Sequence, residues 1–114
     1  SRVKSIRDTM RRPTHPGALL REDVLPALKM TQTELAQLLG VSQLTVSELI
    51  NEKRSMSPSM AIKVATLLNT SAESWLLMQQ ALDLWEVRQN SAAVNAVKPL
   101  SESRLAGLPK HGET

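Results

Sequence analysis

The stretch QTELAQLLGVSQLTVSELIN, residues 32–51, has the spacing of two short helices that meet at a glycine. Thr31 precedes the first helix, and its hydroxyl is placed to accept from the backbone N–H of Glu34. Gly40 can adopt the positive φ that ends a helix, and Ser42 can cap the second helix. One face of each helix is apolar: Leu35, Ala36 and Leu39 in the first, Val46, Leu49 and Ile50 in the second. This pattern predicts a helix-turn-helix with the small Ala36 at the crossing.

The outward side of the second helix carries a short polar row near its N-terminus. In DNA recognition, a glutamine side chain can pair with adenine, a threonine or leucine methyl can contact thymine, and a carboxylate can accept from cytosine. The alternative is a solvated helix face with no ligand, but the position after a helix-turn-helix hinge favours DNA. We therefore predict these base-reading residues: Gln43, Leu44, Thr45, Ser47 and Glu48.

Polar and basic residues flank the same helix. Such groups hold DNA phosphates, which fix the register of a protein on the duplex without reading its sequence. The predicted phosphate ligands are Gln32 at the start of the first helix, and Asn51, Lys53 and Arg54 just after the second.

Short blocks around this motif resemble HigA-type antitoxins, the virulence-associated protein I-like members of the Xre/Cro-type repressor family. HPG at residues 15–17 and LLRED at 19–23 precede the motif, and NEKR at 51–54, SP at 57–58 and SWLLMQ at 74–79 follow it. The likeness runs from about residue 13 to residue 90. One departure is Glu52, where relatives often carry glycine.

The resemblance implies an all-α fold, a five-helix Xre/lambda-repressor-like DNA-binding domain. It also implies a homodimer that binds double-stranded DNA at a palindromic operator and represses its own operon. The implied protein partner is a HigB-like toxin that cleaves mRNA, as in type II toxin–antitoxin modules. Two alternatives remain open: a phage-type repressor without a toxin partner, and a protein-interaction module that no longer binds DNA.

Helix signals outside the motif complete the expected domain. Pro16 begins a first helix that Pro26 interrupts or kinks, with Leu20, Val24 and Leu28 on its core side. Ser57 and Pro58 open another helix, which Asn69 ends. Thr70 with Glu73 forms a capping box for a last helix that continues to residue 90. The predicted organisation is a basic arm at 1–12, a DNA-binding and dimerisation domain at 13–90, and a C-terminal tail of low order at 91–114.

The last helix carries two apolar stripes. Trp75, Met78, Leu82 and Trp85 form one stripe at helical spacing, and Leu77, Ala81 and Leu84 form the other. One stripe can cover the core of the same subunit, so we predict that the second is a two-fold dimer interface. A single wide core face within a monomer is the alternative.

Charge is divided unevenly along the chain. The net charge is +4 over residues 1–16, −2 over 17–90 and +1 over 91–114, which gives the +3 of the whole chain. The expected DNA-binding domain is therefore slightly acidic, so we expect modest affinity for non-specific DNA and dependence on two reading helices per dimer.

The amino-acid composition argues against several other classes of protein. The chain has no cysteine, no apolar run of membrane-spanning length and no signal-peptide pattern, so the expected location is the cytoplasm, with no membrane partner. The two histidines, His15 and His111, lie in opposite tails, and no glycine-rich phosphate loop is present. We therefore expect no enzyme, no cofactor and no metal site, with His15 helping to begin the first helix.

The N-terminal and C-terminal tails each allow two interpretations. Residues 1–12 form either a disordered terminus or an arm that reaches phosphates or the toxin. Residues 91–114 lack a period long enough to fold alone, yet spaced apolar residues would allow them to order on the toxin. These residues are Val94, Val97, Leu100, Leu105 and Leu108.

Overall fold

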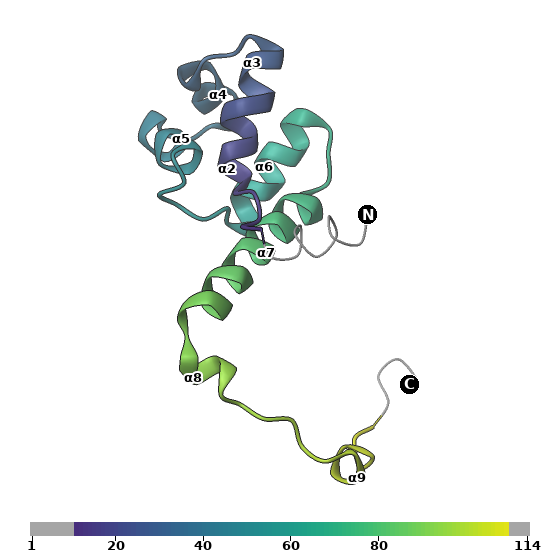
Figure 1. The fold of residues 1–114 in the computed structure, drawn as a ribbon. Helices are drawn as coiled ribbons and strands as arrows, with labels where there is room; N and C mark the ends of the chain where they lie inside the picture. Colours follow the sequence, from purple (N-terminus) through teal and green to yellow (C-terminus); the bar gives the residue numbers. More distant parts are fainter. Residues whose placement is uncertain (1–10, 110–114) are drawn as a thin grey trace, which may run out of the picture.

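The computed structural model describes residues 11–109, which are helical with no strand among them (Figure 1). The helices are α2 Pro16–Leu19, η1 Leu20–Val24, α3 Leu25–Leu28, α4 Gln32–Leu39, α5 Gln43–Ile50, α6 Pro58–Leu68, α7 Ala72–Asn90, α8 Ala92–Asn95 and α9 Glu102–Leu105. Because α2, η1 and α3 follow one another without a break, they act as one helix, and the body has the five helices expected. The all-α prediction is confirmed. Most of the predicted basic arm, and His111, lie outside the described residues.

The first helix passes through Pro26 because its middle is a π-helix. Proline has no N–H, and its ring presses on the carbonyl four residues earlier, so a wider turn just before it relieves the conflict. The backbone N–H of Leu25 accordingly donates to the carbonyl of Leu20, five residues back. Because the wider turn holds one more residue, the next residue to face the core comes five positions after Leu20 rather than four. Leu20 and Leu25 are accordingly buried. The expectation that Leu28 faces the core is therefore wrong: its side chain is 52% exposed.

The helix-turn-helix forms from the caps that the sequence predicted. Thr31 Oγ1 accepts from the backbone N–H of Glu34 at 3.1 Å, and Ser42 Oγ accepts from that of Thr45 at 3.1 Å. Gly40 ends α4 with a φ of 72°. The expected inward residues of both helices are buried: Leu35, Ala36, Leu39, Val46, Leu49 and Ile50.

The start of α7 differs from the prediction by one residue. Ser71, not Thr70, is the N-cap, and its Oγ accepts from the backbone N–H of Ser74 at 3.0 Å. Thr70 still belongs to the end of α6, because its backbone N–H donates to the carbonyl of Ala65 at 2.9 Å. The Thr70 hydroxyl instead accepts from Trp75 Nε1 at 2.8 Å, which ties the buried indole to the turn.

The HPG segment controls how closely the first helix approaches α5. His15 caps α2 through Nδ1, which accepts from the backbone N–H of Gly17 at 2.8 Å, and Pro16 occupies the first turn. Gly17 lies against α5, where a Cβ atom would collide with the carbonyl group of Leu49. The absence of a side chain at residue 17 thus lets the two backbones touch.

Helix α7 is the longest helix and leaves the body toward α8 and α9 (Figure 1). Its first stripe covers the core: Trp75 and Leu82 are buried, and Met78 packs against the buried cluster. The second stripe faces outward, with Leu77 62% and Leu84 44% exposed. Beyond α7, Ser91 and Ser101 cap the single-turn helices α8 and α9, and neither helix has a buried residue.

Replacing Gly17 with alanine tests the close helix crossing. The new methyl group meets rigid backbone rather than a flexible side chain, so Gly17→Ala should lower the free energy of unfolding by about 3 kcal/mol. Gly107→Ala is the matched control, because its nearest neighbour outside the adjacent residues would be 3.5 Å away, an ordinary contact. Urea denaturation measures both changes, and equal stabilities of the two variants would contradict the proposed packing.

Candidate nucleic-acid interface

The outward face of α5 starts one residue after the cap Ser42. Gln43 and Leu44 are exposed there, and Thr45, Ser47 and Glu48 are half-buried. Residues three and four apart on a helix are neighbours, so Glu48 lies next to both Thr45 and Leu44 on this face. The structure thus presents all five predicted base-reading side chains at the surface, and their role in reading bases stays a prediction.

Hydrogen bonds among neighbours restrict the first of these side chains. Gln43 Nε2 donates to Thr33 Oγ1 of α4 at 2.7 Å, so the amide bridges the two helices of the motif. The hydroxyls of Ser42 and Thr45 lie 2.8 Å apart and share a hydrogen bond. Both contacts are exposed, so a ligand can replace them without uncovering a buried polar group.

The predicted phosphate ligands lie at the ends of α4 and α5. Gln32 is the first residue of α4, and Lys53 is exposed in the turn after α5. Asn51 closes α5, and its Nδ2 donates to the carbonyl of Ser47 at 2.9 Å. Arg54 turns back toward the helix, where Nη2 and Nε donate to Glu48 Oε1 at 2.6 and 3.1 Å. The sequence pattern did not predict that these two charged side chains pair.

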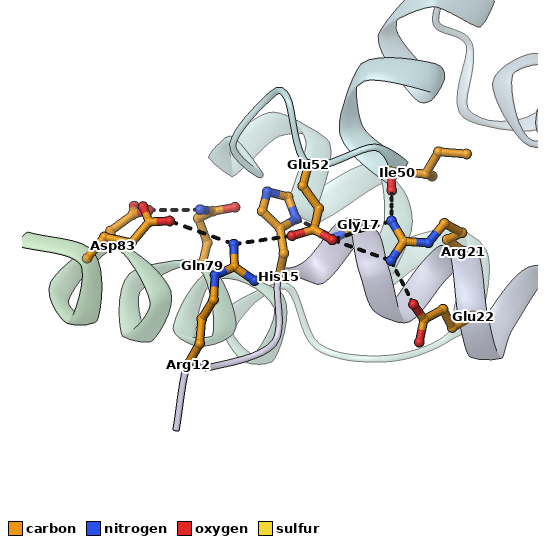
Figure 2. A network of polar contacts seen from close by, with 10 residues as sticks. Arg12, His15, Gly17, Arg21, Glu22, Ile50, Glu52, Gln79 and Asp83 are labelled. Carbon is orange, nitrogen blue, oxygen red and sulfur yellow. Dashed lines mark hydrogen bonds and ion pairs between the residues drawn. The ribbon is translucent and has the colours of Figure 1, made fainter. Parts of the chain in front are cut away.

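A polar network secures the C-terminal end of α5 (Figure 2). Arg21 Nη1 donates to the carbonyl of Ile50, the last residue of α5, at 2.6 Å. Glu52 has a φ of 62°, in the region where glycine is favoured, and its carboxylate pairs with Arg12 at 3.2 Å and Arg21 at 3.4 Å. Arg12 also lies 3.7 Å from Glu86 of α7. Sequence reasoning missed this network, because its partners are 29 to 74 residues apart.

Two buried polar side chains support the same region. His15 is only 4% exposed, and burial lowers the pKa of its imidazole, although the nearby Glu52 acts in the opposite direction. The neutral ring keeps Nδ1 free to accept from Gly17, so the expected role of His15 at the helix start is confirmed. Gln79 of α7 accepts from the backbone N–H of Met56 at 2.8 Å and donates to Asp83 at 2.9 Å. This glutamine joins α7 to the loop that follows α5.

A hollow of about 420 Å³ lies beside the exposed stripe of α7, lined by Pro13, Ala81, Leu84, Trp85, Arg88 and Gln89. Trp85 Nε1 is buried and has no hydrogen-bond partner in the described part of the chain. Over residues 11–109, we find neither a cluster of three or more acidic, histidine or cysteine residues suited to a metal nor a helix able to cross a membrane.

Comparison with known sequences connects this geometry to a family. The helix-turn-helix family HTH_3 matches residues 20–75. Antitoxin HigA-1 of Vibrio cholerae is 40% identical over 96 residues, which cover 83% of this chain and 90% of the relative. Virulence-associated protein I of Dichelobacter nodosus is 34% identical over 87 residues, covering 76% of this chain and 81% of the relative.

Solved structures agree with the sequence relatives. The antitoxin GraA superposes with a TM-score of 0.73 at 34% identity, covering 79% of this chain and 99% of GraA. The structure described as "Pseudomonas aeruginosa antitoxin HigA with higBA promoter" gives a TM-score of 0.72 at 33% identity, covering 79% of this chain and 100% of that one. By fold and by sequence, then, this chain belongs to the HigA-type antitoxins, within the Xre-type helix-turn-helix family.

Proposed function

We propose that this chain is a sequence-specific DNA-binding antitoxin that binds a palindromic operator as a dimer and represses its own operon. The observation that carries the proposal is the outward polar row of α5, held by the Ser42 cap and by the close approach of Gly17. The comparisons support it, since one relative was solved with the higBA promoter and GraA was solved in complex with its operator.

Each side chain of the row has a proposed partner in the major groove. Gln43 pairs with adenine after releasing Thr33, and Leu44 and the methyl of Thr45 contact thymine methyls. Ser47 donates or accepts at a base edge, and Glu48 accepts from the amino group of cytosine. At the ends of α4 and α5, Gln32, Asn51, Lys53 and Arg54 bind phosphates and fix the register.

Removing two of the reading side chains should weaken operator binding while leaving the fold intact. We expect Gln43→Ala combined with Thr45→Ala to cost about 1 to 3 kcal/mol of binding free energy for each lost base contact. The matched control is Gln37→Ala with Thr66→Ala, which removes the same side-chain types from exposed positions on α4 and α6. Fluorescence anisotropy with the DNA upstream of the gene measures the effect, and an unchanged affinity would mean that α5 is not the reading helix.

We propose that the exposed stripe of α7, formed by Leu77, Ala81 and Leu84, is the dimer interface. Exposed apolar side chains beside a hollow are typical of an interface, and a two-fold dimer is its commonest form. Such a dimer would present two copies of α5 about one DNA turn, ~34 Å, apart, as a palindrome requires.

Charged residues in this stripe should produce monomers. Leu77→Asp with Leu84→Asp places two carboxylates where apolar side chains would meet across the two-fold axis, so sedimentation at micromolar concentration should change from dimer to monomer. Ile62→Asp is the control, because Ile62 is 58% exposed on α6, away from the stripe. A wild-type protein that sediments as a monomer would contradict this interface.

We propose a HigB-like, mRNA-cleaving toxin as the protein partner, supported by the names of the relatives. The antitoxin would act by binding, with no catalytic step, cofactor or membrane partner of its own, and in the cytoplasm. Co-expression with the product of the neighbouring gene should restore growth and give a complex in a pull-down. Growth arrest that this chain does not relieve, together with intact operator binding, would favour a phage-type repressor without a toxin.

A further inference from the structure

Glu48 and Arg54 form the ion pair nearest to the base-reading row. Two N–H groups of Arg54, on Nη2 and Nε, donate to the same carboxylate oxygen of Glu48, at 2.6 and 3.1 Å. The other oxygen, Oε2, is not used by Arg54. The side chains of Glu48 and Arg54 are 35% and 46% exposed, so both can reach a ligand.

A carboxylate on a DNA-reading helix faces an electrostatic problem. The duplex carries one negative charge per ~1.7 Å of its axis, so an uncompensated glutamate would weaken binding to every sequence. Glu48 is the only charged residue of α5. The guanidinium of Arg54 neutralises it locally, and two hydrogen bonds to one oxygen restrict the orientation of the carboxylate.

The free oxygen has one suitable partner among the base edges. In the major groove, the amino group of cytosine is a donor with no adjacent acceptor on the same base, which fits a carboxylate oxygen. Glu48 lies four residues after Leu44 and three after Thr45, so its side chain leaves α5 next to both of theirs. The guanidinium has five N–H donors, and two of them bind Glu48. The remaining donors allow Arg54 to bind a phosphate at the same time.

We propose that Glu48 and Arg54 act as one reading unit for a C·G base pair in each operator half-site. Glu48 accepts from the cytosine amino group through Oε2, and Arg54 is a positioning residue that orients and neutralises the carboxylate. This inference rests on the proposed DNA-binding function. It gives Arg54 an effect on base selectivity, which a phosphate ligand alone would not have.

The test measures binding of the wild-type protein to the upstream operator and to duplexes with each base pair replaced singly. We expect one C·G pair per half-site whose replacement by T·A weakens binding roughly tenfold. Glu48→Ala should abolish this preference and raise affinity for non-cognate DNA, because a negative charge is removed. Arg54→Ala should reduce the same preference severalfold. The double variant, Glu48→Ala with Arg54→Ala, should distinguish the C·G duplex from the T·A duplex no less well than Glu48→Ala alone.

Lys53→Ala is the matched control, since Lys53 is a basic neighbour in the same turn. It should weaken binding equally on every duplex and leave the C·G preference unchanged. If Arg54→Ala behaves like Lys53→Ala, or if Glu48→Ala keeps the preference, the reading unit is disproved while sequence-specific binding by α5 stands. A wild-type protein that distinguishes no duplex from any other would instead disprove the proposed function itself. Thermal melting of each variant checks that these surface changes leave the fold intact.

Discussion

The close contact between the backbone of Gly17 and the carbonyl group of Leu49 sets the position of α5 in the fold. It brings the first helix directly onto α5, and only a residue without a side chain permits that distance. The same segment supplies the cap His15, whose buried neutral imidazole accepts from Gly17. One tripeptide therefore starts the first helix and also sets the depth at which α5 lies against it.

Polar contacts then fix the orientation of α5 at both ends. At its N-terminus, Ser42 caps α5, and the hydrogen bond from Gln43 to Thr33 joins it to α4. At its C-terminus, Arg21 binds the carbonyl of Ile50 and pairs with Glu52. A positive φ at Glu52 costs about 1 kcal/mol relative to glycine, and its ion pairs with two arginines offset part of that cost. The strain of this non-glycine residue is thus partly relieved by its own ion pairs.

Features that depend on local sequence were predictable. The caps Thr31, Ser42 and Ser57 were correct, because each accepts from a backbone N–H three residues later. Features that depend on competing hydrogen-bond partners or on residues distant in the sequence could not be predicted. Because of the π-helix η1, Leu25 rather than Leu28 faces the core. The backbone hydrogen bond from the N–H of Thr70 to the carbonyl of Ala65 leaves Ser71 as the cap of α7. The pairing of Arg54 with Glu48 and of Glu52 with two arginines was also missed, since no periodic pattern marks such contacts.

In the proposed complex, α5 enters a DNA groove with its N-terminal polar row leading. The most direct measurement is amide NMR of the ¹⁵N-labelled protein during titration with a duplex from upstream of its own gene. The largest shifts should occur at Gln43, Thr45 and Glu48 and in the turn around Lys53, with α8 and α9 unaffected. Shifts confined to α6 and α7, with the amides of α5 unchanged at saturation, would contradict this binding mode.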